Sequence, residues 1–237
     1  MAKYVIDENT LASLADKIRS LSGGVDSLTT ADMEAMLTEA SGDVQTQKSL
    51  IAQIKLALAG KAAGEGGGDT GSEEVASLLG NTMTVLDNSL VTSLRTRACQ
   101  GATKLVTVNL PNVTSLGAYA FYSCSGLQDC KLPKLTTIST QTWYGCSKLQ
   151  HADCGELGNI SAQTFNACSA LTELILRKTG SICTLANTNG VSNTPIGSGT
   201  GYVYVPRALI DSYKAATNWS TFASQFRAIE DYPDICG

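Results

Sequence analysis

The sequence predicts an α+β protein in which a short solenoid of 22-residue repeats lies between a helical N-terminal segment and a C-terminal strand-helix cap. Two observations favour this fold class. Apolar residues recur in register every 22 residues from 91 to 178. On either side of that region the period is lost, and apolar residues follow helical spacing.

Four units of equal length align without an insertion: 91–112, 113–134, 135–156 and 157–178. Six positions are apolar or small in every unit. Position 15 holds Leu105, Leu127, Leu149 and Leu171, and position 9 holds Cys99, Phe121, Trp143 and Phe165. A single unit cannot bury its apolar edge alone, so neighbouring units must stack as coils.

Each coil is expected to contain two short strands and a bend. Apolar positions 15, 18 and 20 approach the period of a strand, which Pro111 and Pro133 end in two units. A second strand such as 113–116 follows. The segment AYAFYSCS (118–125) then predicts a helical or irregular turn whose aromatic side chain fills the core.

The cysteines fit this pattern as small core residues. Position 12 holds Ala102, Cys124, Cys146 and Cys168, which indicates a tight packing site. A metal site that adds His151 and Cys154 is the alternative, but these two should lie on opposite faces of a strand. Disulfides between coils stay open, although three equivalent cysteines cannot all pair among themselves. We expect no metal and no cofactor.

The segment VTSLGAYAFYSCSGLQDCKLP (113–133) resembles the BspA-type leucine-rich repeat family. The resemblance covers roughly 85–178, and MTVLDNSL (83–90) looks like the strand of a degenerate opening unit. It implies a leucine-rich-repeat solenoid over 73–237 that includes a cap over 179–237. In that cap, Tyr202 to Val205 predicts a strand and Pro206 a helix start. Two helix faces follow, formed by Leu209, Ile210 and Tyr213 and by Trp219, Phe222 and Phe226.

Residues 1–59 predict a helical attachment and oligomerisation segment. A helix is expected over 9–21, and Thr29 and Asp32 resemble a capping box before a second helix. A third run has an a/d seam, formed by Val44, Gln47, Ile51, Ile54 and Leu58. The seam favours a homotrimer or tetramer, and packing within the chain has equal weight. The Gly-rich segment 60–72 predicts a flexible linker.

Both ends also resemble parts of phage proteins. ENTLASLADKIRSLSGG (8–24) and LTTADMEAML (28–37) are similar to N-terminal segments of tail and baseplate-associated proteins of phages and prophages. Residues 202–233 resemble the C-terminal portion of repeat proteins from the same elements. The resemblance implies a virion tail fibre or baseplate protein that contacts other tail proteins. The N-terminus has no apolar leader, so synthesis in the host cytoplasm without a signal peptide is expected.

Composition argues against several function classes. The net charge is −4 and no basic stripe is present, so nucleic acid is not an expected partner. No run approaches the ~20 apolar residues of a membrane span, so membrane insertion is not expected. The chain has one histidine and no recognised catalytic motif, and we therefore expect no enzyme and no catalytic residues.

A binding surface is the remaining prediction. Strand positions 17 and 19 should point outward, which gives a polar column of Thr107, Asn109, Asp129, Lys131, His151, Asp153 and Glu173, followed by Ile175. A second column holds Gln100, Tyr122, Tyr144 and Asn166. Its tyrosines are expected either to stack on sugars or peptides or to be partly buried against neighbouring coils. Three functions fit: a phage fibre that binds a host-surface glycan or protein, a bacterial surface adhesin, and a purely structural tail protein.

Overall fold

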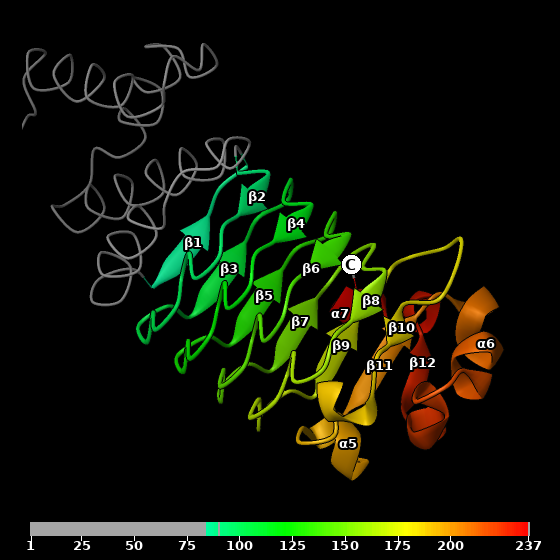
Figure 1. Ribbon diagram of the computed structural model, residues 1–237. Coiled ribbons are helices and arrows are strands. Elements are labelled where there is room, and N and C mark those ends of the chain that lie inside the picture. The colour runs from blue at the N-terminus through cyan, green and yellow to red at the C-terminus, as the bar shows by residue number, and fades with distance from the viewer. Residues whose placement is uncertain (1–83, 90, 237) are drawn as a thin grey trace, which may run out of the picture.

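The computed structural model describes residues 84–89 and 91–236 (Figure 1). The predicted N-terminal helices, the seam from Val44 to Leu58 and the linker 60–72 lie outside the described residues. Within the described part, no helix is long and apolar enough to cross a membrane.

Seven parallel strands form the main sheet, in the order β1-β3-β5-β7-β9-β11-β12. They are β1 (Val85–Asp87), β3 (Thr107–Asn109), β5 (Asp129–Lys131), β7 (His151–Asp153), β9 (Glu173–Ile175), β11 (Tyr202–Val205) and β12 (Phe226–Ala228). Thr107 is paired with Asp129, and Asp129 is paired in turn with His151, so each partner lies 22 residues further along the chain. Successive coils run in the same direction, which makes the pairing parallel.

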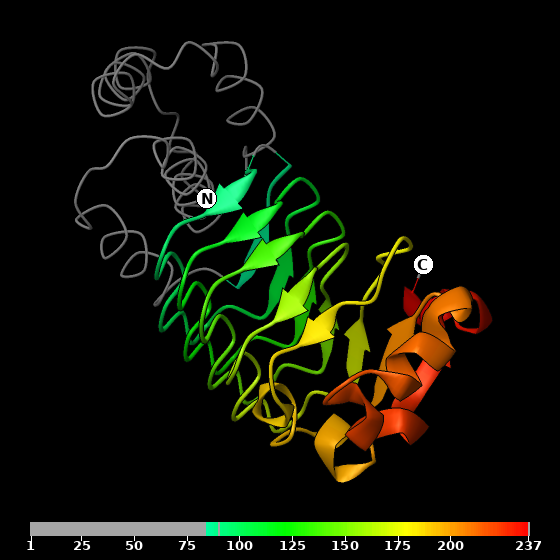
Figure 2. The same ribbon diagram turned by 45° about the vertical axis from the view of Figure 1, so that its right-hand side comes forward.

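A second line of shorter strands runs along the solenoid (Figures 1 and 2). It consists of β2 (Ser93–Leu94), β4 (Ser115–Leu116) and β6 (Thr137–Ile138), with β8 (Asn159–Ile160) and β10 (Thr184–Leu185) as a separate pair. The stacking continues past residue 178. There Ile160 is paired with Leu185, so this coil is three residues longer at that point than the preceding ones.

The bend of each coil depends on two residues with left-handed backbone angles. The first is Arg97, Tyr119, Gln141 or Gln163, and the second is Gly101, Ser123, Gly145 or Ala167. Only two of these eight positions hold glycine. The predicted helical or irregular turn is therefore a series of tight turns. Backbone hydrogen bonds join neighbouring bends, as from the Phe121 N–H to the Thr142 carbonyl, 2.8 Å apart.

Two ladders of side chains fill the core beneath the bends. The rings of Phe121, Trp143 and Phe165 stack with centroids 6.1 and 5.1 Å apart. Beside them, the thiols of Cys124, Cys146 and Cys168 donate to the carbonyls of Cys99, Phe121 and Trp143 at 2.9, 3.0 and 3.0 Å. Each thiol thus bridges to the preceding coil, which gives the cysteine position a polar role as well as a small volume.

The C-terminal region closes the far end of the solenoid (Figure 2). It comprises η2 (Thr188–Gly190), α5 (Pro195–Ser198), η3 (Arg207–Leu209), α6 (Ile210–Ala215), η4 (Trp219–Gln225), η5 (Ile229–Asp231) and α7 (Pro233–Cys236). Tyr213 and Trp219 anchor it to one residue: the Cys183 N–H donates to the Tyr213 hydroxyl at 2.8 Å, and the Trp219 indole donates to the Cys183 carbonyl at 2.7 Å.

The second predicted helix face in this region is wrong in one respect. Trp219 and Phe222 lie in the 3-10 segment η4, whose backbone is interrupted at Phe222, and Phe226 begins strand β12. The three aromatic residues still pack together, because the Trp219 ring contacts both Phe222 and Phe226, with centroids 6.4 and 5.6 Å apart. A shared apolar cluster therefore produced the helical spacing without one continuous α-helix.

The left-handed position of the bend gives a test of the repeat backbone. Gly145→Ala should lower the free energy of unfolding by about 1 kcal/mol, because a Cβ is strained at this backbone angle and would lie 3.3 Å from the Ser123 Oγ. Ala167→Gly, at the equivalent position of the next coil, relieves the same strain and should raise the free energy of unfolding by less than about 1 kcal/mol. Urea unfolding measures both.

Ala162→Gly, at an ordinary backbone angle, is the matched control and should lower the free energy of unfolding. If this control raised the free energy of unfolding as much as Ala167→Gly does, strain at the left-handed position would not be the explanation.

Buried thiols predict how stability depends on pH. Burial raises the pKa of Cys183 to about 12, and it raises the pKa values of Cys99, Cys146 and Cys154 well above the ordinary value of a thiol. Unfolded thiols ionise near pH 8.5 while the folded ones stay neutral, so this stabilisation is complete below about pH 8.5 and is lost as the pH rises. Urea unfolding in the presence of a reductant should give a lower free energy at pH 10 than at pH 7.5. Equal stability at both values would contradict it.

Candidate functional site

The outward side chains of β3, β5, β7 and β9 form the surface that we call the strand face. Its members are Thr107, Asn109, Asp129, Lys131, His151 and Glu173. The inward residues between them, such as Cys130 and Ala152, are fully or almost fully buried. Successive side chains of a strand point to opposite faces, so a buried central residue places its neighbours outside.

A row of three ionisable side chains crosses the strand face. The His151 Nδ1 lies 2.6 Å from the Asp129 Oδ1, and its Nε2 lies 3.2 Å from the Glu173 Oε2. Parallel in-register pairing of β5, β7 and β9 brings these residues side by side. The side chains of Asp129 and His151 are 40% and 43% exposed, so the row is held in place yet remains open to a partner.

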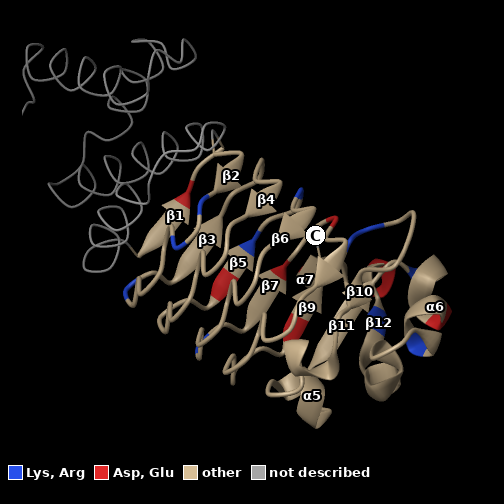
Figure 3. Ribbon diagram, viewed as in Figure 1, with Lys and Arg blue, Asp and Glu red and all other residues tan. Residues whose placement is uncertain are grey.

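The neighbouring row, at position 19 of the repeat, changes in charge from one strand to the next. The Asn109 side-chain amide donates to the Asp87 Oδ1 at 3.1 Å, and Lys131 is exposed. Figure 3 shows acidic and basic residues together on these strands. Across this row an acidic residue on β1, Asp87, is followed by a neutral one on β3, Asn109, and a basic one on β5, Lys131.

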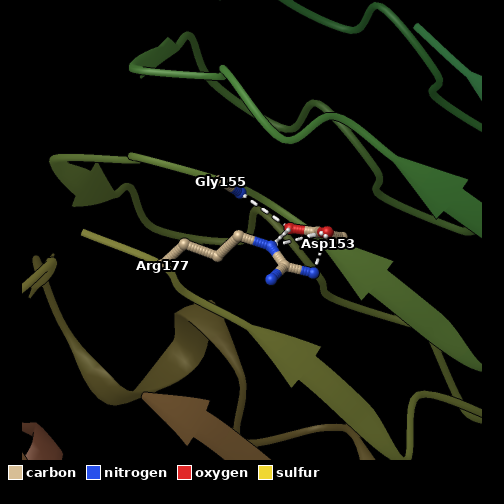
Figure 4. A network of polar contacts seen from close by, with 3 residues as sticks. All are labelled: Asp153, Gly155 and Arg177. Carbon is tan, nitrogen blue, oxygen red and sulfur yellow. Dashed lines mark hydrogen bonds and ion pairs between the residues drawn. The ribbon is translucent and has the colours of Figure 1, made fainter. Parts of the chain in front are cut away.

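Asp153 does not belong to the exposed surface, contrary to the sequence-based prediction. It is only 6% exposed. Its Oδ2 accepts hydrogen bonds from the Arg177 Nε at 2.9 Å and from the Arg177 Nη2 at 2.7 Å. Its Oδ1 accepts a third from the Gly155 N–H at 3.1 Å (Figure 4). The hydrogen bonds that Arg177 donates to Asp153 raise the pKa of its guanidinium.

Ile175 is also buried, because the C-terminal segment returns to this part of the sheet. Ile175, Tyr204 and Cys236 form a small apolar cluster, and Tyr232 packs edge-on against Tyr204 with ring centroids 5.3 Å apart. No motif in the sequence indicates that residues beyond 230 would cover β9 and β11. The exposed strand face is therefore shorter than the sequence predicts at position 19.

The second predicted column lies on the bends. Tyr122 and Tyr144 stack on each other with centroids 5.1 Å apart and an interplanar angle of 7°. Tyr119 packs edge-on against Tyr122 at 5.7 Å. All three are partly buried. The ring faces of the Tyr122–Tyr144 pair thus contact each other, as expected for burial against a neighbouring coil.

The cysteines offer no metal site in the described residues. All eight are free thiols and all are buried. His151 lies on the outer face whereas Cys154 is fully buried, so the two do not converge. Within 84–89 and 91–236, no group of three or more His, Cys, Asp or Glu side chains has a metal-binding arrangement.

Comparison with known proteins identifies the repeat. Residues 82–193 match the BspA type leucine rich repeat region in six copies. No curated protein matches the chain. A crystal structure of a leucine rich cell surface protein from Faecalibacterium prausnitzii A2-165 is similar at 22% identity and a TM-score of 0.42; the similarity covers 52% of this chain and 31% of that one. This chain thus matches about a third of that protein's length.

The Asp153–Arg177 pair should contribute to stability and not to binding. Arg177→Ala leaves a buried carboxylate with one backbone donor, so it should lower the free energy of unfolding by about 2 kcal/mol, below the full cost of breaking a buried pair because Arg177 is partly exposed. The double variant Asp153→Leu/Arg177→Met should recover most of the loss, because no charge is left unpaired. Thermal unfolding measures both; an unchanged Arg177→Ala variant would show that the pair is unimportant.

Proposed function

We propose that the chain is a display protein whose repeat region presents the strand face to a glycan or protein on a host-cell surface. Residues 1–59 attach it, as a homotrimer, to other proteins of a virion tail or baseplate, and the linker 60–72 separates this attachment from the displayed solenoid. The observation that carries the proposal is the strand face itself, a fixed polar surface on a rigid parallel sheet.

Preorganisation supports a binding role for this surface. Asp129, His151 and Glu173 hold one another in place before any ligand arrives. Ordering flexible side chains at an interface costs free energy, about 0.5–1.5 kcal/mol for each long side chain. A surface whose side chains are already ordered avoids part of that cost.

Charge supports selectivity. The strand face carries Asp129 and Lys131 on the same strand, so it presents both signs within one strand. A surface with charges of both signs disfavours partners that place like charges opposite its own, and it speeds the association of partners with complementary charges. Repeat proteins commonly bind through extended faces of this kind.

Three candidates remain for the kind of protein to which the repeat region belongs. The resemblance of both chain ends to phage proteins supports a virion tail fibre or baseplate component. A bacterial cell-surface adhesin with the same repeat type is the alternative, and a tail protein without a receptor role is the third possibility.

Immunogold labelling should separate these carriers. Antibodies against the full chain are expected to label the tails of purified virions from an induced lysate. Label on intact bacterial cells, with none on virions, would support the adhesin. Label on neither would contradict a displayed protein.

Variants of the strand face test the binding role. The full chain carrying Asp129→Asn, Lys131→Ala and His151→Ala should lose at least tenfold in affinity for intact host cells, because it removes ionic contacts from both rows of the strand face. Flow cytometry with labelled protein measures the binding. Lys148→Ala removes a positive charge from an exposed position outside the strand face and is the matched control. If the triple variant binds as well as the wild-type chain, the strand face is not the contact surface.

A further inference from the structure

A second surface with different chemistry lies on the bends of the four coils. It consists of two rows of side chains at positions 7 and 10 of the repeat, which we call the bend face. Its members are Arg97, Gln100, Tyr119, Tyr122, Gln141, Tyr144, Gln163 and Asn166. Stacked coils repeat at about 4.8 Å, so the two rows extend over roughly 14 Å.

Contacts along the rows hold this surface in a fixed arrangement. The Arg97 guanidinium lies 5.6 Å from the centre of the Tyr119 ring, and the Gln141 amide donates to the Gln163 Oε1 at 2.8 Å. Tyr119, Tyr122 and Tyr144 pack on one another as described above. The left-handed backbone at position 7 recurs in all four coils, so the bends place these side chains in register.

Several polar groups of the bend face remain available to a ligand. Within the described part of the chain, the hydroxyls of Tyr119, Tyr122 and Tyr144 make no hydrogen bond. The same holds for the side-chain amides of Gln100 and Asn166. None of these five groups is a buried atom that lacks a partner, so they face solvent. Hydroxyl and amide groups supply both donors and acceptors.

The charge of the bend face distinguishes it from the strand face. Seven of its eight residues are uncharged, and none is acidic. Arg97, at the N-terminal end of the rows, is its single charge, so most of the surface offers a charged polymer no ionic partner. Since Tyr122 and Tyr144 use their facing ring surfaces on each other, a ligand meets hydroxyls, amides and ring edges rather than an open aromatic plane.

We infer that the bend face binds an uncharged polyhydroxylated glycan. A row of sugar hydroxyls can donate to and accept from the phenol and amide groups at regular intervals along the solenoid. A protein partner fits less well, because it would bury tyrosine ring faces at the centre of the interface, and the facing rings of Tyr122 and Tyr144 are already stacked on each other. The inference extends the proposed function to a second face and does not require the strand face to bind.

Binding of the full chain to immobilised dextran, yeast mannan and maltodextrin tests this inference, with heparin as a charged comparison. Biolayer interferometry should show binding to at least one of the three neutral glycans, and raising the salt concentration to 0.5 M should leave it unchanged. Tyr122→Phe/Tyr144→Phe removes two hydroxyls and keeps the ring stack, so it should weaken binding about tenfold with an unchanged melting temperature.

The control is Asp129→Asn/His151→Ala on the strand face, which should leave glycan binding unchanged. If none of the three neutral glycans binds, or if only heparin binds, the glycan assignment is overturned. Full binding by the double phenylalanine variant would also overturn it. Loss of cell binding in the strand-face variant, with neutral-glycan binding retained, keeps the two surfaces separate; failure of one therefore does not imply failure of the other.

Discussion

In-register stacking of the coils is the constraint on which the rest of the structure depends. From β1 to β9 every paired strand residue lies 22 positions from its partner. A residue type that recurs at one repeat position therefore becomes a continuous row in space. Inward rows form the core and outward rows form surfaces, so one spacing determines both the stability of the solenoid and the chemistry that it presents.

The interior shows why small and bulky residues must keep their positions. The aromatic stack from Phe121 to Phe165 fills the space beneath the bends. The cysteine ladder lies beside it, and each thiol hydrogen-bonds to a carbonyl of the preceding coil. Alanine could match the volume of cysteine approximately, but it could not make that bond. These thiols are buried and therefore shielded from reagents and ligands, which leaves the outward rows as the surfaces on which binding can occur.

The C-terminal region limits those outward rows. It seals the last coil through Cys183 and then returns over β9 and β11, where Ile175 and Tyr204 become buried. Asp153 is removed from the surface by a different contact, because Arg177, at the end of the fourth repeat, reaches back to it from beyond the next strand. A position that is exposed on β5 is therefore buried on β7. What remains open is a charged strand face toward the N-terminal side and a bend face along the coils that carries one charge, at Arg97.

The sequence by itself determined the repeat length, the inward columns and the alternation of each strand, because a 22-residue period and a two-residue period are both visible in the order of the residues. It also placed Asp129 and His151 in one outward row. Only the tertiary structure decided that Asp153 pairs with Arg177, that Phe226 begins a strand, and that the tyrosines close their ring faces on each other. These outcomes depend on where distant segments meet, and a local pattern of apolar residues carries no information about which segment will cover it.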